Sequence, residues 1–267
     1  MLVVYAVESF LRRLSMSDHA HQMVLKGGML VAVSQIRKMT KDADLSTHGI
    51  AGDEESVRHI VARICALEPE PHDGVTVDMA TIRTEAMRAE DEYQGVRCKL
   101  IATLGQAQIP FALDFSFGDP NQSTVIELES VIERAPVRLK AYPLALNLAE
   151  KIVTAMQRRE TNTRARDFAD LWVTSRRHCL AAPELRGHIF DVASHRKQPV
   201  MPMTAALADM PDRQQSYAAM VERMSYLSPP PARWTDLIDG VIDFTDPLLA
   251  DEGERLASWD PARLTWI

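Results

Sequence analysis

The chain has 267 residues, of which 46% are hydrophobic and 25% charged, and its formal net charge is −7. These values are typical of globular proteins and exclude the collagen-like, disordered and disulfide-scaffold classes. The three cysteines are few and far apart, as expected for reduced thiols in the cytoplasm. The start, MLVVYAVESFLRR, has too short an apolar run for a membrane span and lacks the basic-then-apolar order of a signal peptide. We therefore expect a cytoplasmic protein that does not enter a membrane.

Charge is distributed unevenly along the chain. Residues 138–197 contain 12 basic and 6 acidic residues, whereas residues 1–135 have a net charge of −7 and residues 198–267 a net charge of −6. A basic segment between acidic ones can face the phosphates of a nucleic acid. A solvated helical face with many salt bridges gives the same pattern, and the charges alone favour that second interpretation.

Helical spacing of apolar residues dominates the first part of the chain. It predicts a helix over 2–16 and another over 54–67, which the Pro- and Gly-containing cluster 68–74 ends. Between these two helices, Gly27-Gly28 interrupt the apolar segment 21–33.

The periodicity then changes to one typical of strands. Apolar residues alternate with polar ones between 75 and 117, which predicts three strands joined by turns at 91–95 and 105–110. After Pro143 the pattern is helical, with few strand signals before residue 198. The sequence thus predicts an α/β (α+β) chain with two domains, 1–137 containing the sheet and 138–267 mainly helical.

Three acidic residues are the first candidates for chemistry. If Asp42 and Asp44 lie on a strand, both carboxylates share one face of it, and a divalent cation such as Mg²⁺ would relieve their repulsion. Gly27 and Gly28 allow a backbone to approach a phosphate closely. Asp114 stands between apolar neighbours on the clearest predicted strand, where a carboxylate needs a partner, water or a metal ion. An exposed strand end with two acids is the simpler interpretation of Asp42 and Asp44 alone.

A second group lies in the helical part. Lys151 belongs to the helix that begins near Pro143, and Asp167 and Asp170 are three residues apart, on one helix face. A lysine and an acid held near a triphosphate can neutralise charge and orient a nucleotide. Ordinary ion pairing on a helix surface is the local alternative.

Together these segments resemble the AbiEii family of nucleotidyltransferase toxins, which includes the mycobacterial MenT toxins. Two departures from the family pattern concern Met29, which stands where the first motif often has serine, and Arg166, which replaces a lysine. The resembling segments are Leu25-Lys26-Gly27-Gly28, Lys41-Asp42-Ala43-Asp44-Leu45, Leu113-Asp114-Phe115 through Gly118-Asp119-Pro120, Ala149-Glu150-Lys151, and Arg164-Ala165-Arg166-Asp167-Phe168-Ala169-Asp170-Leu171-Trp172.

The resemblance implies a nucleotidyltransferase fold with a mixed sheet and a helical C-terminal lobe. It implies transfer of a nucleoside monophosphate, a pyrimidine, from an NTP to the 3′ end of tRNA, which blocks aminoacylation and translation. It also implies Mg²⁺ or Mn²⁺ as cofactor and a cognate antitoxin as partner, while nothing in the sequence demands more than a monomer.

The resemblance also assigns roles to residues. Asp42 and Asp44 would hold the metal with Asp114 as third acid, Lys151 and Gly27-Gly28 would contact the nucleotide, and Asp167 would be the acid of the later motif. The basic segment would hold RNA through Arg158, Arg159, Arg164, Arg166, Arg176 and Arg177. Two alternatives stay open: transfer to a protein or small-molecule hydroxyl, and a nucleotide-binding interaction module without turnover.

Overall fold

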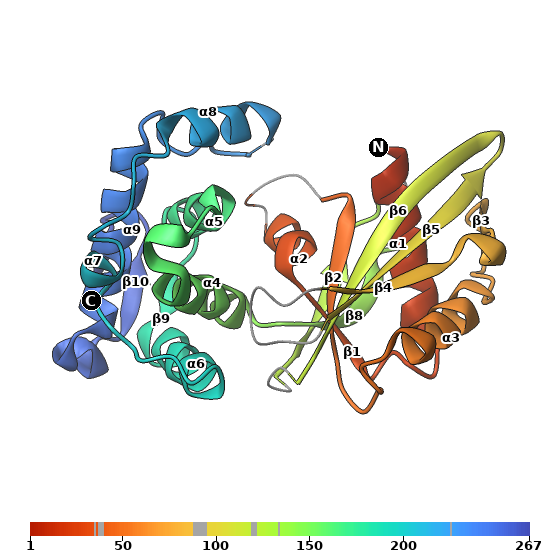
Figure 1. Ribbon diagram of the computed structural model, residues 1–267, viewed down its shortest axis with the longest axis horizontal. Helices are drawn as coiled ribbons and strands as arrows, with labels where there is room; N and C mark the ends of the chain where they lie inside the picture. Colours follow the sequence, from red (N-terminus) through yellow and green to blue (C-terminus); the bar gives the residue numbers. More distant parts are fainter. Residues whose placement is uncertain (35, 37–39, 88–94, 119–121, 133, 225) are drawn as a thin grey trace. The chain divides into compact units, whose positions relative to one another are not determined.

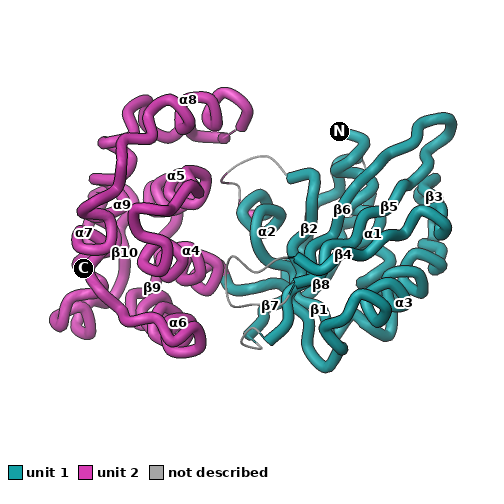
Figure 2. The backbone as a smooth tube through the Cα atoms, in the orientation of Figure 1, with its two compact units in different colours: residues 1–33, 39–143 teal, residues 34–38, 144–267 magenta. Residues whose placement is uncertain are grey.

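The computed structural model describes residues 1–267 except 35, 37–39, 88–94, 119–121, 133 and 225 (Figure 1). The chain forms two compact units, which Figure 2 colours separately. The first contains residues 1–33 and 39–143, and the second contains 34–38 and 144–267. The assignment of 1–137 and 138–267 as catalytic and helical lobes stays a prediction.

The first unit is built around a mixed sheet with the strand order β3-β5-β6-β2-β1-β8-β7, and β4 pairs with β5 (Figure 1). The pairs β1–β8 and β2–β6 are parallel, whereas the others are antiparallel. The strands are β1 Met23–Lys26, β2 Asp42–Thr47, β3 Val75–Val77, β4 Arg83–Met87, β5 Gly95–Leu104, β6 Ala107–Phe117, β7 Thr124–Leu128 and β8 Val137–Ala141.

Helices α1 and α3 pack on this sheet. The predicted helix over 2–16 is confirmed as α1 Leu2–Met16, which contacts β6 and β8. α3 Glu54–Cys65 contacts β4 and β5, and it begins where the Asp53 carboxylate accepts a hydrogen bond of 2.8 Å from the Ser56 N–H. The described residues of this unit also form two shorter helices, α2 Gly27–Val33 and the 3₁₀ helix η1 Met79–Thr81.

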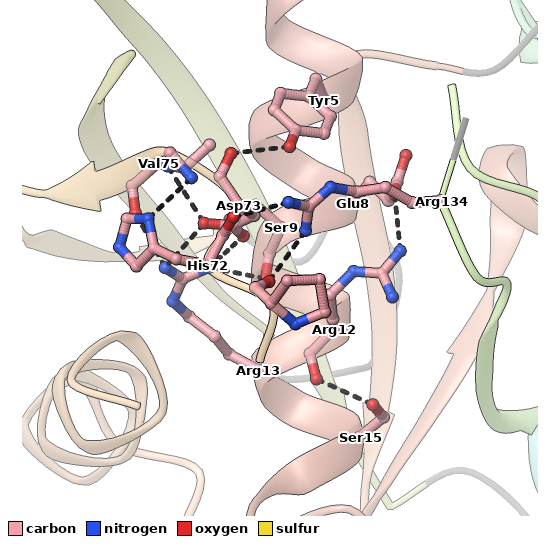
Figure 3. A network of polar contacts seen from close by, with 12 residues as sticks. Tyr5, Glu8, Ser9, Arg12, Arg13, Ser15, His72, Asp73, Val75 and Arg134 are labelled. Carbon is pink, nitrogen blue, oxygen red and sulfur yellow. Dashed lines mark hydrogen bonds and ion pairs between the residues drawn. The ribbon is translucent and has the colours of Figure 1, made fainter. Parts of the chain in front are cut away.

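A buried ion pair fixes α1 to the loop before β3 (Figure 3). The Arg13 guanidinium donates to the Asp73 carboxylate at 2.6 Å, and the Ser9 hydroxyl donates to the same group at 2.7 Å. Arg13 and Asp73 are 3% and 1% exposed in their side chains. Since a buried charge needs a partner, these contacts set the position of α1 against the sheet.

The alternation of side chains on the central strands positions the acids. Ala43, Leu113 and Phe115 are buried, whereas Asp42, Asp44 and Asp114 between them are half-buried on the other face. Strand geometry produces this division, because successive side chains point to opposite faces of a sheet.

The strand predictions were partly wrong. Among the described residues between 75 and 117 there are four strands, not three, and β4 has an exposed sequence without apolar alternation. The turn between β5 and β6 is only Gly105 and Gln106, so Pro110 lies inside β6, opposite Ile101. Proline is tolerated there because β2 pairs only with residues 112–117 and leaves that side of β6 unpaired. The expected turn at 91–95 and Asp119 lie largely outside the described residues.

The second unit is mainly helical, as predicted. A small sheet with the order β11-β10-β9 joins its C-terminal segment to the loop before α6. The elements are α4 Leu144–Arg158, η2 Arg159–Thr161, α5 Ala165–Ser175, β9 Leu180–Ala181, α6 Ala182–His195, α7 Met203–Ala206, α8 Gln214–Arg223, α9 Trp234–Leu249, η3 Asp251–Arg255, β10 Ser258–Asp260 and β11 Thr265–Trp266.

Residues 34–38 belong to this second unit although both flanking segments belong to the first. The Ser34 carbonyl lies 2.9 Å from the His178 ring nitrogen Nε2, and the Ile36 carbonyl accepts a hydrogen bond of 3.2 Å from the Leu227 N–H. Within the described part of the chain, no helix is long and apolar enough to cross a membrane.

Candidate functional site

The candidate acids of the first unit lie in one row across the sheet. Asp44 on β2 is directly opposite Asp114 on β6, and Lys26 on β1 is directly opposite Asp44. Asp42 is two residues before Asp44 on the same strand, so both carboxylates share a face, as predicted. The parallel pairing of β2 with β6, which the sequence did not indicate, brings Asp114 beside them.

Gly27 and Gly28 lie against Asp44. Gly27 has φ +62°, and a Cβ atom built on it would lie 2.1 Å from Asp44 Oδ2. The Gly28 N–H donates to the same oxygen at 3.2 Å. Only glycine at position 27 therefore admits the Asp44 carboxylate, both because of its backbone conformation and because of the missing side chain.

The surroundings of Asp44 disfavour its charged form. Burial is the largest cause, and the nearby Asp42 and Asp114 carboxylates add to it, so that the pKa of Asp44 is raised to about 6. The Gly28 hydrogen bond and Lys26 act in the opposite direction but do not compensate. A carboxylate in such a position is a candidate for a functional role.

Asp114 is held by an arginine that the sequence analysis did not single out. Arg97 on β5 is directly opposite Asp114, and its Nε and Nη2 donate to the two carboxylate oxygens at 2.7 and 2.6 Å. The hydrogen bonds to Asp114 raise the pKa of Arg97. This fork occupies both oxygens of Asp114.

The acids of the first unit offer only part of a metal-binding site. Among the residues that the structure describes, no three His, Cys, Asp or Glu side chains gather closely enough to hold a metal ion. Asp42 and Asp44 nonetheless offer hard oxygen ligands beside a glycine backbone. This donor set fits Mg²⁺, which usually binds one or two carboxylates together with waters and substrate phosphates.

The candidate residues of the second unit form a buried ion-pair cluster. Lys151 on α4 lies 2.6 Å from the Asp167 carboxylate and 3.2 Å from that of Asp170, both on α5. Asp170 is fully buried, and Lys151 and Asp167 are 10% and 18% exposed in their side chains. The predicted shared face of Asp167 and Asp170 is confirmed, although the ion pair is buried and does not lie on a helix surface.

Electrostatics keep Asp167 ionised. Burial would raise its pKa, but Lys151 and the neighbouring Arg164 and Arg166 outweigh burial, and the net result is a lowered pKa. The Tyr226 hydroxyl donates to Asp170 at 3.3 Å. Tyr226 had no signal in the sequence, because it lies 56 residues from its partner.

The six candidate arginines differ in their surroundings. Arg159, Arg164, Arg166 and Arg177 are exposed, whereas Arg158 and Arg176 are half-buried. Arg176 stacks on the Trp172 ring at 3.7 Å from its centre, and burial lowers its pKa. The four exposed arginines are therefore the better candidates for binding a phosphate backbone.

Comparison with known proteins identifies the family. Residues 9–241 match the family described as nucleotidyl transferase AbiEii toxin, type IV TA system. That match covers most of the chain, so the chain belongs to this family. It is thus a nucleotidyltransferase toxin of a toxin–antitoxin system, with an NTP as substrate and an antitoxin as partner. No curated protein matches the sequence.

Two solved structures are similar to this chain. MenT4, a nucleotidyltransferase toxin from Mycobacterium tuberculosis H37Rv, is similar over 95% of this chain and 86% of its own, with 16% identity and a TM-score of 0.55. JHP933 from Helicobacter pylori is similar over 70% of this chain and 71% of its own, with 14% identity and a TM-score of 0.44. The likeness to MenT4 confirms the predicted fold class, a mixed-sheet nucleotidyltransferase fold with additional helices.

Proposed function

We propose that this toxin transfers a nucleoside monophosphate, a pyrimidine, from an NTP to the 3′ end of tRNA in a Mg²⁺-dependent reaction. One observation carries the proposal: the missing side chain of Gly27 leaves room for the Asp44 carboxylate, which lies beside Asp42 and Asp114. An acid with raised pKa, next to a second acid on the same strand, is suited to a divalent cation that arrives with phosphates.

The residues have distinct proposed roles. Asp42 and Asp44 hold Mg²⁺, with Asp114 as the third acid, and the backbone at Gly27-Gly28 approaches the phosphates. When bound, Mg²⁺ neutralises charge on the transferring phosphate and on the leaving pyrophosphate. Lys151 contacts the triphosphate, and Asp167 orients its ammonium group through the contact of 2.6 Å. Transfer to tRNA would prevent aminoacylation and so stop translation.

The exposed arginines hold the RNA backbone in this proposal. Arg159, Arg164, Arg166 and Arg177 supply positive charge in a chain that is acidic as a whole. Phosphate contacts of this kind are independent of RNA sequence and steer the acceptor to the enzyme. We further propose that the toxin acts as a monomer in the cytoplasm.

The test uses the purified chain, Mg²⁺, total tRNA and each of the four α-labelled NTPs in separate reactions. We expect label to enter tRNA most readily from a pyrimidine nucleotide, and Asp44→Asn to abolish it. Glu127→Gln is the matched control, because Glu127 is an acid of the same sheet that is 62% exposed and distant from the row.

Each other result has a defined meaning. Label in a protein or small molecule, without label in tRNA, would show that tRNA is not the acceptor, while the nucleotidyltransferase activity would stand. If no acceptor is labelled by any nucleotide while nucleotide still binds, the tRNA transfer is refuted in favour of a binding module.

A further inference from the structure

Two cations enclose the two central acids of the sheet. In the order of the strands, Arg97 on β5, Asp114 on β6, Asp44 on β2 and Lys26 on β1 are direct cross-strand neighbours. We call these four residues the charge row. Its formal charges cancel, so the acids already have protein counter-ions, and both oxygens of Asp114 accept hydrogen bonds from Arg97.

The fork between Arg97 and Asp114 opposes metal binding at that carboxylate. Both oxygens of Asp114 accept hydrogen bonds from Arg97, at 2.7 and 2.6 Å, and the Asp114 side chain is only 12% exposed. A divalent cation at Asp114 would have to share these oxygens with the guanidinium, and two cations at one carboxylate repel each other where water is largely excluded. The triphosphate of an NTP brings negative charge that would offset this repulsion.

We propose that Arg97 is the resident counter-cation of Asp114 and competes with the divalent metal ion for it, so that the metal binds tightly only together with the nucleotide. This inference rests on the proposed metal-dependent function. It assigns Arg97 as a positioning residue that acts through Asp114. The consequence is an order of binding: the metal-free toxin retains little metal until an NTP is present.

The test measures Mn²⁺ binding to the full, metal-free chain without nucleotide, from the electron paramagnetic resonance signal of free Mn²⁺. We expect Arg97→Gln to bind Mn²⁺ about tenfold or more tightly than the wild type, because the metal ion no longer competes with two hydrogen bonds between charged groups. Lys99→Gln is the matched control. Lys99 lies two residues along the same strand face and pairs with Glu85 at 2.6 Å, so its removal changes the same charge without touching Asp114.

Two further measurements decide whether Arg97 acts through Asp114. In an Asp114→Asn background, Arg97→Gln should no longer change the Mn²⁺ affinity, as a double-mutant cycle reveals. With a non-hydrolysable NTP analogue present, the difference between wild type and Arg97→Gln should shrink. An unchanged or weakened Mn²⁺ affinity in Arg97→Gln would overturn the inference, as would an equal gain in Lys99→Gln.

The failure of this inference can be distinguished from failure of the proposed function. If wild type and Arg97→Gln bind Mn²⁺ equally and Asp44→Asn abolishes binding, the metal site stands and the role of Arg97 is refuted. If no variant binds Mn²⁺, with or without nucleotide, both are refuted. Arg97 is 39% exposed, so the variant should fold, as circular dichroism will check. Should it not fold, Arg97→Lys replaces it, with a smaller gain in affinity expected because the fork is lost.

Discussion

At the scale of single residues, Asp44 is the position where stability and chemistry conflict. Its pKa of about 6 lies above the ordinary value of 3.8, because burial and two neighbouring carboxylates disfavour the anion. The folded protein therefore binds the proton more tightly than the unfolded chain does. Asp44 therefore leaves the free energy of unfolding unchanged below about pH 4. It lowers that free energy as the pH rises from about 4 to 6, and the full loss is reached above about pH 6.

Asp44→Asn should accordingly stabilise the metal-free protein at pH 8, by about 2–3 kcal/mol, because asparagine cannot ionise. The gain should disappear as the pH falls from 6 to 4. Denaturant unfolding in EDTA at a series of pH values measures it, with Glu127→Gln as control. A gain that is the same at pH 4 and pH 8 would contradict the raised pKa.

Gly27 provides a second prediction at this scale. Gly27→Ala should displace the Asp44 carboxylate, because the new Cβ would lie 2.1 Å from Asp44 Oδ2, and nucleotide transfer should fall by at least about a hundredfold. Gly105→Ala is the control, since Gly105 has a similar φ of +58° but nothing within 4 Å of the new Cβ. Turnover and unfolding are measured for both. Equal losses of activity would mean that backbone strain, not the position of Asp44, explains the effect.

At the scale of the elements, the sequence predicted on which face of a strand or helix a residue lies better than it predicted which strands pair. The alternation around Asp114 placed it correctly on the half-buried side of β6, and the helical pattern placed Lys151, Asp167 and Asp170 on their helices. The roles of these residues stay predictions. Arg97 was missed because the turn between β5 and β6 was expected at 105–110. A two-residue turn at Gly105-Gln106 would have set Arg97 opposite Asp114 at once, since loop length determines hairpin register.

The parallel pairs could not be predicted in this way. The strand β2 lies beside β6 although more than 60 residues separate Asp44 from Asp114, and no local pattern specifies a parallel partner. The contact of Tyr226 with Asp170 has the same origin. Sequence patterns report local structure, whereas these contacts depend on how distant elements pack.

The attachment of α1 can be tested at this scale. Asp73→Ala leaves the Arg13 guanidinium buried without its carboxylate, at 3% side-chain exposure, and should lower the free energy of unfolding by about 3–5 kcal/mol. Asp78→Ala, which removes an exposed acid at the start of η1, is the control and should cost about 1 kcal/mol. Denaturant unfolding compares them. If both variants lose the same stability, the ion pair does not hold α1 as described.

At the scale of the whole molecule, the contrast between an acidic chain and its basic segment predicts that the proposed RNA binding depends on salt. We expect tRNA affinity to fall steeply between 50 and 200 mM salt, because phosphate contacts release counter-ions. Arg166→Gln should reduce the slope of log affinity against log salt by about 1. The control is Arg263→Gln, in the acidic C-terminal segment, where the side chain is 76% exposed. An unchanged slope in Arg166→Gln would exclude this residue from the RNA-binding surface.

The assignment of residues 34–38 to the second unit has a consequence for synthesis on the ribosome. A nascent chain that has reached residue 143 already contains every strand of the large sheet, but it lacks His178 and Leu227. Those are the residues that hold Ser34 and Ile36, just ahead of the strand with Asp42 and Asp44. Domains generally fold in the order in which they emerge from the ribosome, so the sheet can form early. The contacts of Ser34 and Ile36 can form only after residues 178 and 227 have been synthesised. During translation there is therefore a delay between formation of the sheet that contains Asp42 and Asp44 and formation of the contacts that hold Ser34 and Ile36.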